Sequence, residues 1–249
     1  MKNILIKAEN ISPASNSDAV YSPLSLNILK SSITSIIGPG SVEKILWLKT
    51  LNGLNAMAQG ELTLLQKNVR QLDRQAWLGL QNKISFIGQD TALLSAYTLM
   101  ENIMLPALYH KLADRDEISR QADVLLDEIG FEGKEMLKQL PAYASQLQNY
   151  YVKVVRALIV KPQLLFLDDL YTHLSLDKVL NLKQFLRHKV DSMGLSIVLT
   201  TRNIKQIIDE STNIIFVSPD TTALYENRQD LLKSDNASIK EYLSRYEIH

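Results

Sequence analysis

The chain has 249 residues, of which 46% are hydrophobic and 22% charged, enough for one or two compact lobes with a sizeable core. Its 27 basic and 27 acidic residues cancel, so bulk charge indicates neither nucleic acid nor an anionic membrane as a partner. The absence of cysteine excludes disulfides and thiolate metal sites. No run approaches the roughly 20 apolar residues that span a bilayer, and the N-terminus lacks the apolar core of a signal peptide. We therefore expect a soluble polypeptide that reaches a membrane only through a partner.

Short β-type runs alternate with helical patterns along most of the chain. Strands are predicted at Ile33–Ile37, Glu61–Leu65, Lys83–Ile87, Leu164–Leu167, Ser196–Thr200 and Ile214–Val217. Several of these runs are almost continuously apolar, as expected for strands buried on both faces of a mostly parallel sheet. Helices are predicted at Leu46–Leu54, Leu176–Asp191, Ile204–Glu210 and Ser238–Tyr246. The alternation predicts an α/β fold.

The middle of the chain differs from the rest. From about Thr91 to Lys153 it has helical patterns, including Ser119–Ile129 and Asn149–Leu158, and no convincing strand. This predicts a helical subdomain over residues 91–158, inserted into a nucleotide-binding core lobe made of residues 1–90 and 159–249.

Residues 38–46, Gly-Pro-Gly-Ser-Val-Glu-Lys-Ile-Leu, carry part of a phosphate-binding loop. The P-loop pattern is G-x-x-x-x-G-K-[ST] between a strand and a helix, and Gly38 and Lys44 have its separation. Glu43 replaces the second glycine, and Ile45 replaces the hydroxyl that binds Mg²⁺. The pattern predicts a poor nucleotide site. Its candidate residues are Gly38, Pro39, Gly40, Ser41, Glu43, Lys44, Ile45 and Leu46.

The second half of the candidate site is the run Leu164 to Asp169, an apolar strand that ends in two carboxylates. A carboxylate at the carboxyl end of a parallel strand can reach a metal held on phosphates, and a second one can polarise an attacking water. Asp168 is the candidate Mg²⁺ ligand and Asp169 the candidate catalytic carboxylate. Alone, the pair also suits a turn or a helix cap.

The order and spacing of these motifs resemble the ATP-binding cassette (ABC) ATPase subunits over essentially the whole chain. The family's glutamine loop matches Ile84–Asp90, with Gln89 as the residue that contacts Mg²⁺ and joins the lobes. Its signature motif aligns with Ala144–Gln148, of which Ser145 and Gln148 are kept. The resemblance implies a P-loop NTPase of the RecA-like type with a helical subdomain, with Asp168 and Gln89 near Mg²⁺.

Within that family, residues 92–109 and the short C-terminal helix are similar to ATPase subunits of MCE-type bacterial lipid importers. The residues from Thr98 to Asn102 are equally consistent with an ordinary helix start, in which Thr98 is the N-cap and Glu101 completes a capping box.

Several residues depart from the family pattern. A carboxylate at Glu43 opposes phosphate by roughly 4 kcal/mol per charge pair at 4 Å and an effective dielectric near 20. Ile45 offers no oxygen to Mg²⁺. Asp169 is one methylene shorter than the family's catalytic glutamate, and Arg202, at the switch-histidine position, cannot accept a proton. ATP and Mg²⁺ are thus implied by the resemblance but opposed by these residues.

The resemblance also implies partners, because ATP in this family lies between the P-loop of one subunit and the signature of another. Gln146 and Leu147 replace the signature glycines that allow close approach to phosphate. A homodimer would have every half-site damaged, whereas a heterodimer keeps the partner's P-loop, so a second, intact ABC ATPase subunit is favoured. A transmembrane permease would dock in the cleft around Gln89–Tyr109.

Two functions remain open. The first is a catalytically degenerate subunit with a structural or regulatory role, and the second is a working ATPase that uses Lys44, Asp168 and Asp169 to power (lipid) transport. A soluble ABC-type protein without a transporter is disfavoured, since such proteins commonly carry two cassettes. We expect a cytoplasmic protein, peripheral on the inner face of the membrane, without nucleic acid because its basic residues are dispersed.

Two finer hypotheses concern the loop. Glu43 is a candidate for an internal ion pair with Lys44 or Arg202 that holds the loop shut. Tyr21 is a candidate for the adenine-stacking ring, since no aromatic lies near Pro13.

Overall fold

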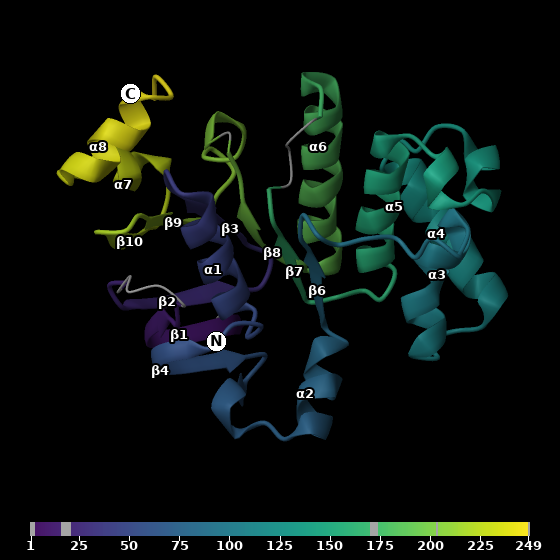
Figure 1. Cartoon of the computed structure of the whole chain (residues 1–249), viewed down its shortest axis with the longest axis horizontal. Helices are drawn as coiled ribbons and strands as arrows, with labels where there is room; N and C mark the ends of the chain where they lie inside the picture. The colour runs from purple at the N-terminus through teal and green to yellow at the C-terminus, as the bar shows by residue number, and fades with distance from the viewer. Residues whose placement is uncertain (1–2, 16–20, 170–173, 203, 249) are drawn as a thin grey trace.

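The computed structural model describes residues 3–15, 21–169, 174–202 and 204–248, which form two sheets surrounded by helices (Figure 1). The strands are β1 Ile4–Pro13, β2 Leu24–Leu29, β3 Ile33–Ile37, β4 Met57–Leu64, β5 Lys67–Asn68, β6 Ile84–Ile87, β7 Leu164–Leu167, β8 Ser196–Thr200, β9 Asn213–Val217 and β10 Thr222–Tyr225. The α-helices are α1 Ser41–Leu51, α2 Arg74–Gln81, α3 Leu99–Tyr109, α4 Arg115–Glu128, α5 Gln146–Leu158, α6 Leu176–Met193, α7 Arg228–Leu232 and α8 Ala237–Ser244. No helix in these ranges is long and apolar enough to cross a membrane.

The larger sheet has the strand order β10-β9-β3-β8-β7-β6, and every neighbouring pair except β10–β9 is parallel. Strands β3, β7 and β8 are buried along their whole length. The predicted α/β fold with a mostly parallel sheet is therefore confirmed. Because the parallel strands end at one edge, the segments that follow β3, β6, β7 and β8 meet there.

Alternate residues of the central strands enter two different apolar cores. Leu164 and Phe166 pack with Trp47 of α1 in one core, on the side of the smaller sheet. Leu165 and Leu167 belong to the other core, which also contains residues of α3, α4, α5 and α6. This two-sided burial fixes the register of β7, since a slip by one residue would exchange the two faces.

The smaller sheet is antiparallel, with the order β2-β1-β4-β5. The strand predicted at Glu61–Leu65 exists, but it is the end of β4 and belongs here rather than to the parallel sheet. Leu62 and Leu64 are buried whereas Glu61 is exposed, which is the alternation of a strand with one solvated face. The register of β1 shifts at two places along β2, and such irregularities interrupt the alternating pattern by which a strand is recognised.

The prediction of a helix at Ile204–Glu210 is wrong. The structure has a short 3-10 turn at Ile204–Gln206, followed by turns. Ile204, Ile207 and Ile208 are all buried at helical spacing, but the chain must enter β9 at once. The backbone N–H of Thr212 already donates to the carbonyl oxygen of Ile33 at 2.8 Å.

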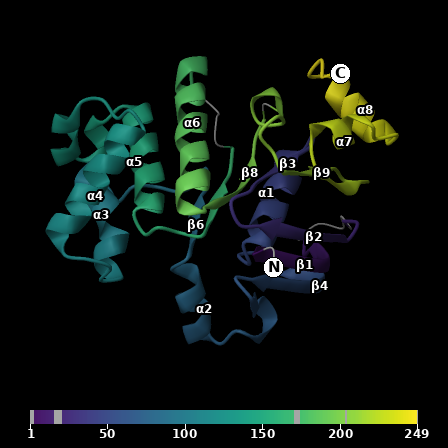
Figure 2. The ribbon, with the colours of Figure 1, turned by 180° about the vertical axis from the view of Figure 1, so that it is seen from behind.

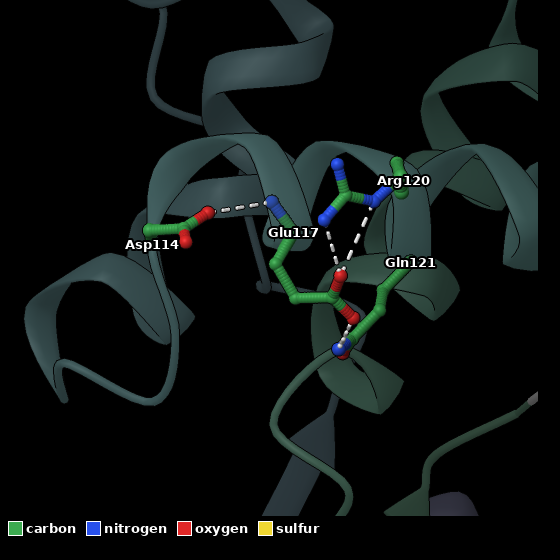
Figure 3. Close-up of polar contacts among 4 residues, drawn as sticks. All are labelled: Asp114, Glu117, Arg120 and Gln121. Carbon is green, nitrogen blue, oxygen red and sulfur yellow. Dashed lines mark hydrogen bonds and ion pairs between the residues drawn. The ribbon is translucent and has the colours of Figure 1, made fainter.

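Helices α3, α4 and α5 lie together beyond β6, on the side of the molecule away from α7 and α8 (Figures 1 and 2). Helix α3 begins with the predicted capping box of Thr98 and Glu101. Helix α4 is capped by Asp114, which accepts from the backbone N–H of Glu117, and the Glu117 carboxylate in turn pairs with Arg120 (Figure 3). The division into a core lobe and a helical subdomain stays a prediction, because these helices share one continuous core with the sheet.

Candidate functional site

Helix α1 begins at Ser41, five residues before the predicted start at Leu46, with Gly40 as its N-cap. Loop backbone is thus left only at Gly38–Gly40 between β3 and α1. Glu43 occupies the third helical position, where an acidic side chain favours the helix dipole and where glycine would cost about 1 kcal/mol relative to alanine. The residue that breaks the P-loop pattern is therefore one that extends the helix.

The Glu43 side chain folds back onto the start of its own helix. A Cβ built on Gly40 would lie 1.7 Å from Glu43 Oε2, so the carboxylate fills the space beside the Gly40 backbone. The expected ion pair of Glu43 is not seen, because Lys44 and Arg202 have other partners. Lys44 Nζ donates to the Gly38 carbonyl oxygen at 2.9 Å, and Arg202 pairs with Asp169.

Lys44 is buried, with 5% of its surface exposed. Burial lowers the pKa of its ammonium group, and Arg202 acts in the same direction, while Asp169 and Asp168 oppose the shift.

The backbone at the start of the loop is constrained by its neighbour, because Gly38 has φ +149° and a Cβ there would lie 1.9 Å from the Val217 carbonyl oxygen. Of the other loop candidates, Pro39 and Ser41 are exposed, and Ile45 and Leu46 are partly buried.

The two carboxylates after β7 are held by the end of the neighbouring strand β8. Thr200 Oγ1 donates to Asp168 Oδ1 at 2.6 Å and accepts from the backbone N–H of Asp169 at 2.8 Å. Asp169 adopts a left-handed backbone with φ +54°, an uncommon conformation for a residue other than glycine. Burial raises the pKa of Asp168, and the neighbouring charge of Asp169 adds to this while the Thr200 hydrogen bond opposes it.

Two candidate site residues, Arg202 and Gln89, contact Asp169 Oδ2. Arg202 Nε lies 2.9 Å away in an ion pair, and Gln89 Nε2 approaches to 3.5 Å, a long contact. The Asp169 side chain is 6% exposed, whereas that of Arg202 is 56% exposed. The carboxylate at the catalytic position is thus neutralised by the residue at the switch position.

A cavity of about 250 Å³ brings several predicted residues together. It is lined by Gln89, Asp168, Asp169 and Arg202, and by Gln146 from the first turn of α5. Ser145 and Gln148 do not line it. They form a capping box at the start of α5, in which Ser145 Oγ accepts from the Gln148 N–H at 3.1 Å and Gln148 Oε1 accepts from the Ser145 N–H at 2.9 Å.

The residues present fit Mg²⁺ in part and phosphates poorly. Asp168 Oδ2 is buried without a hydrogen-bond partner in the described structure, which suits a metal ligand, and Gln89 offers a nearby amide oxygen. Ile45 supplies no oxygen, and the described residues contain no group of three or more His, Cys, Asp or Glu side chains placed to hold a metal. Residues 41–43, which belong to the loop in the P-loop pattern, are helical here, and the Glu43 carboxylate lies beside Gly40.

Sequence reasoning missed some site residues and misjudged another. Thr200 was not assigned a role, although its position at the carboxyl end of β8 was the available signal. Lys153 lines the same cavity from α5, and burial lowers the pKa of its ammonium group. Tyr21 is buried with 5% exposure in the core around α1, so it does not present a free ring face for adenine.

The parallel sheet, the helix that follows β3 and the carboxylate pair that follows β7 define a P-loop NTPase. The family model described as "ABC transporter" matches residues 21–172, more than half of the chain. The chain belongs to the ABC transporter family, as the resemblance of its motifs predicted.

Relatives and solved structures agree with this assignment. The methionine import ATP-binding protein MetN 1 of Acinetobacter baylyi is 28% identical over 256 residues, covering 99% of this chain and 71% of that protein. MetN of Rhizobium johnstonii is 30% identical over 189 residues, covering 76% of this chain and 51% of that protein. This chain thus spans between about half and three quarters of these relatives.

Among solved structures, cbiO1 of Clostridium perfringens, described as part of the ABC transporter complex cbiONQ, superposes with a TM-score of 0.80 at 20% identity. The match covers 98% of this chain and 96% of that one. The ATP-binding cassette MJ0796, in a dimeric post-hydrolysis state with ADP and Pi, gives a TM-score of 0.78 at 22% identity, covering 89% of this chain and 98% of that one. At these identities the likeness shows the fold alone.

Proposed function

We propose that this chain is the ATP-binding-cassette subunit of a membrane transporter and that it serves as a catalytically degenerate half with a structural or regulatory role. The observation that carries the proposal is the Arg202–Asp169 ion pair, 2.9 Å from Nε to Oδ2. A carboxylate polarises an attacking water only if it is free to accept a proton from it. Here a permanent cation stands against that carboxylate.

Ile45 and the shape of α1 support the same proposal. A P-loop subunit that hydrolyses ATP supplies a hydroxyl to Mg²⁺ and a loop of free backbone N–H groups to the phosphates. This chain has the aliphatic Ile45 in place of the hydroxyl, and residues 41–43 form a helical turn in place of the loop. We therefore place the working ATP-binding half on a second, intact cassette and favour a heterodimer. The association would hold the chain at the inner face of the membrane.

The proposed docking place for a permease is a cavity of about 430 Å³ between β6, α3 and α5. Tyr109, at the end of α3, is 78% exposed on its rim, an apolar surface that suits a protein partner. Lys153 and Arg156 of α5 also line it, and burial lowers the pKa of both side chains. A docking segment that brings a carboxylate or a helix C-terminus would complement these cations.

The cargo is proposed from the relatives of this chain rather than from its own residues. The segment on which the resemblance to lipid importers was based contains an ordinary capped helix start at Thr98 and Glu101, which favours no particular cargo. The relatives described above are named for methionine import. We therefore propose methionine as the first cargo to assay, with lipid transport as the comparison.

The alternative is a working ATPase, and the meeting of Asp168, Asp169 and Gln89 in one cavity favours it. The test is steady-state ATP turnover of the complex purified through a tag on this chain, with the subunits that co-purify identified by mass. We expect a permease and an intact cassette, and Asp169→Asn should leave turnover within about twofold. A loss of more than about tenfold would overturn the degenerate role, and two copies of this chain without another cassette would overturn the heterodimer.

A further inference from the structure

The start of α1 has an acidic side chain of its own beside it, that of Glu43. The first N–H groups of a helix have no partner within the helix and attract negative charge. In P-loops, groups of this kind serve phosphates. Here the Glu43 carboxylate lies at this end of α1, with Oε2 1.7 Å from where a Cβ on Gly40 would be.

Lys44, the remaining phosphate-binding residue, is also engaged within the loop. Its ammonium group donates to the Gly38 carbonyl oxygen at 2.9 Å, which ties the beginning of the loop to the second turn of α1. With 5% of its surface exposed, Lys44 has little access to an incoming ligand unless this contact opens.

We propose that Glu43 is a built-in occupant of the phosphate loop, an autoinhibitory contact that excludes nucleotide phosphates until the carboxylate moves away. The carboxylate fills the space beside the Gly40 backbone and repels the phosphates electrostatically. Its helix-forming side chain also keeps residues 41–43 in α1. This inference deepens the proposed catalytically degenerate role of the chain and rests on it.

The test is equilibrium binding of ADP and of ATP to the purified full-length chain, measured in EDTA so that the missing Mg²⁺ ligand plays no part. Three variants separate the contributions of Glu43. Glu43→Ala keeps a good helix former and removes the carboxylate, Glu43→Gln keeps the size and removes the charge, and Glu43→Gly also frees the backbone. Glu117→Gly is the matched control, because Glu117 occupies the same third position of α4 (Figure 3).

We expect Glu43→Ala and Glu43→Gly to raise the affinity for ADP by on the order of tenfold or more, with Glu43→Gln in between and Glu117→Gly unchanged. Adding Lys44→Ala to Glu43→Ala should abolish the gain, which would place the bound phosphates in this loop. Wild-type affinity in all three Glu43 variants would overturn the inference. A gain in Glu43→Gly alone would also overturn it, because backbone winding rather than the carboxylate would then exclude the ligand.

Failure here and failure of the proposed function are distinguishable. The binding experiment uses the isolated chain without Mg²⁺ and reports on Glu43. The turnover experiment uses the complex and reports on Asp169. Hydrogen exchange at residues 44–47, whose N–H groups donate to the first turn of α1, gives a further measure, since release of the helical start in Glu43→Gly should speed exchange there relative to Glu117→Gly.

Discussion

Arg202 Nε lies 2.9 Å from Asp169 Oδ2, and this ion pair joins the segment after β8 to the segment after β7. The pair is asymmetric, because the carboxylate side chain is 6% exposed while the guanidinium side chain is 56% exposed. Solvent therefore screens the pair from one side, and we expect its contribution to folding stability to be close to that of a surface ion pair rather than that of a fully buried one.

The first prediction concerns this pair. In a double-mutant cycle with Arg202→Gln and Asp169→Asn, we expect a coupling energy of about 1 kcal/mol in favour of the pair. The measurement is urea unfolding of the four proteins at low and high salt, where salt should reduce the coupling. Arg187→Gln with Asp191→Asn, an exposed pair on α6, is the control and should couple more weakly. Additivity of Arg202→Gln and Asp169→Asn would show that the contact contributes nothing to stability.

The second prediction concerns the pH dependence of stability at Asp168. Burial raises the pKa of this carboxyl above its ordinary value of 3.8. The folded state therefore binds more protons than the unfolded state above pH 3.8, and stability falls as the pH rises through the raised pKa. Asp168→Asn removes this penalty and keeps an oxygen to accept from Thr200 Oγ1.

We expect Asp168→Asn to be more stable than the wild type at pH 7, by roughly 1 kcal/mol, and to lose that advantage towards pH 3.8 and below. Urea unfolding of both proteins across this pH range is the measurement. Thr200→Val serves as the control, because it removes the hydroxyl that contacts both aspartates and should destabilise the protein at every pH. An advantage of Asp168→Asn that persists unchanged at acidic pH would contradict the prediction.

The third prediction concerns the close approach of Gly38 to β9. A Cβ on Gly38 would lie 1.9 Å from the Val217 carbonyl oxygen, and φ is +149°. Gly38→Ala should therefore destabilise the protein by about 3 kcal/mol or more, because the backbone of the loop or of β9 must move. Gly130→Ala is the control. Its φ of +75° carries the same kind of strain, but a Cβ there meets nothing within 4 Å, so a loss of about 1 kcal/mol is expected.

Thermal or urea unfolding of both variants provides the measurement. Equal losses at the two positions would mean that backbone strain alone matters and that the contact with Val217 relaxes freely. Failure of Gly38→Ala to fold, with a folded Gly130→Ala, agrees with the prediction.

The parallel sheet could be predicted because its strands are nearly continuous apolar runs. In β7, both faces of Leu164–Leu167 are buried, so neighbouring residues in the sequence are all apolar and the run is unmistakable. Strand β1 could not be found in this way, since its register shifts break the alternation of buried and exposed residues. The segment 204–210 was misjudged because three isoleucines at helical spacing also suit a tight turn packed onto a core.

For the site, the sequence singled out Gln89, Asp168, Asp169 and Arg202, and these four line one cavity, since motif order along a parallel sheet predicts which strand ends lie together. It could not decide what each would contact. The expected partners of Glu43 were Lys44 and Arg202, yet Lys44 donates to Gly38 and Arg202 pairs with Asp169. Several opposite charges compete within one small volume, and only packing decides among them.

The sequence by itself determined the class of this protein and its departures from the P-loop pattern at Glu43 and Ile45, because strand periodicity, motif spacing and residue chemistry are local properties. Only the tertiary structure decided that α1 begins at Ser41, that the Glu43 carboxylate lies against Gly40, and that Thr200 holds both aspartates. The Thr200 contacts join the ends of β7 and β8, which only the sheet brings together, and the loop before α1 is constrained by its close approach to Val217 of β9. Their geometry follows from competition among burial, hydrogen bonds and charge, which no single stretch of sequence contains.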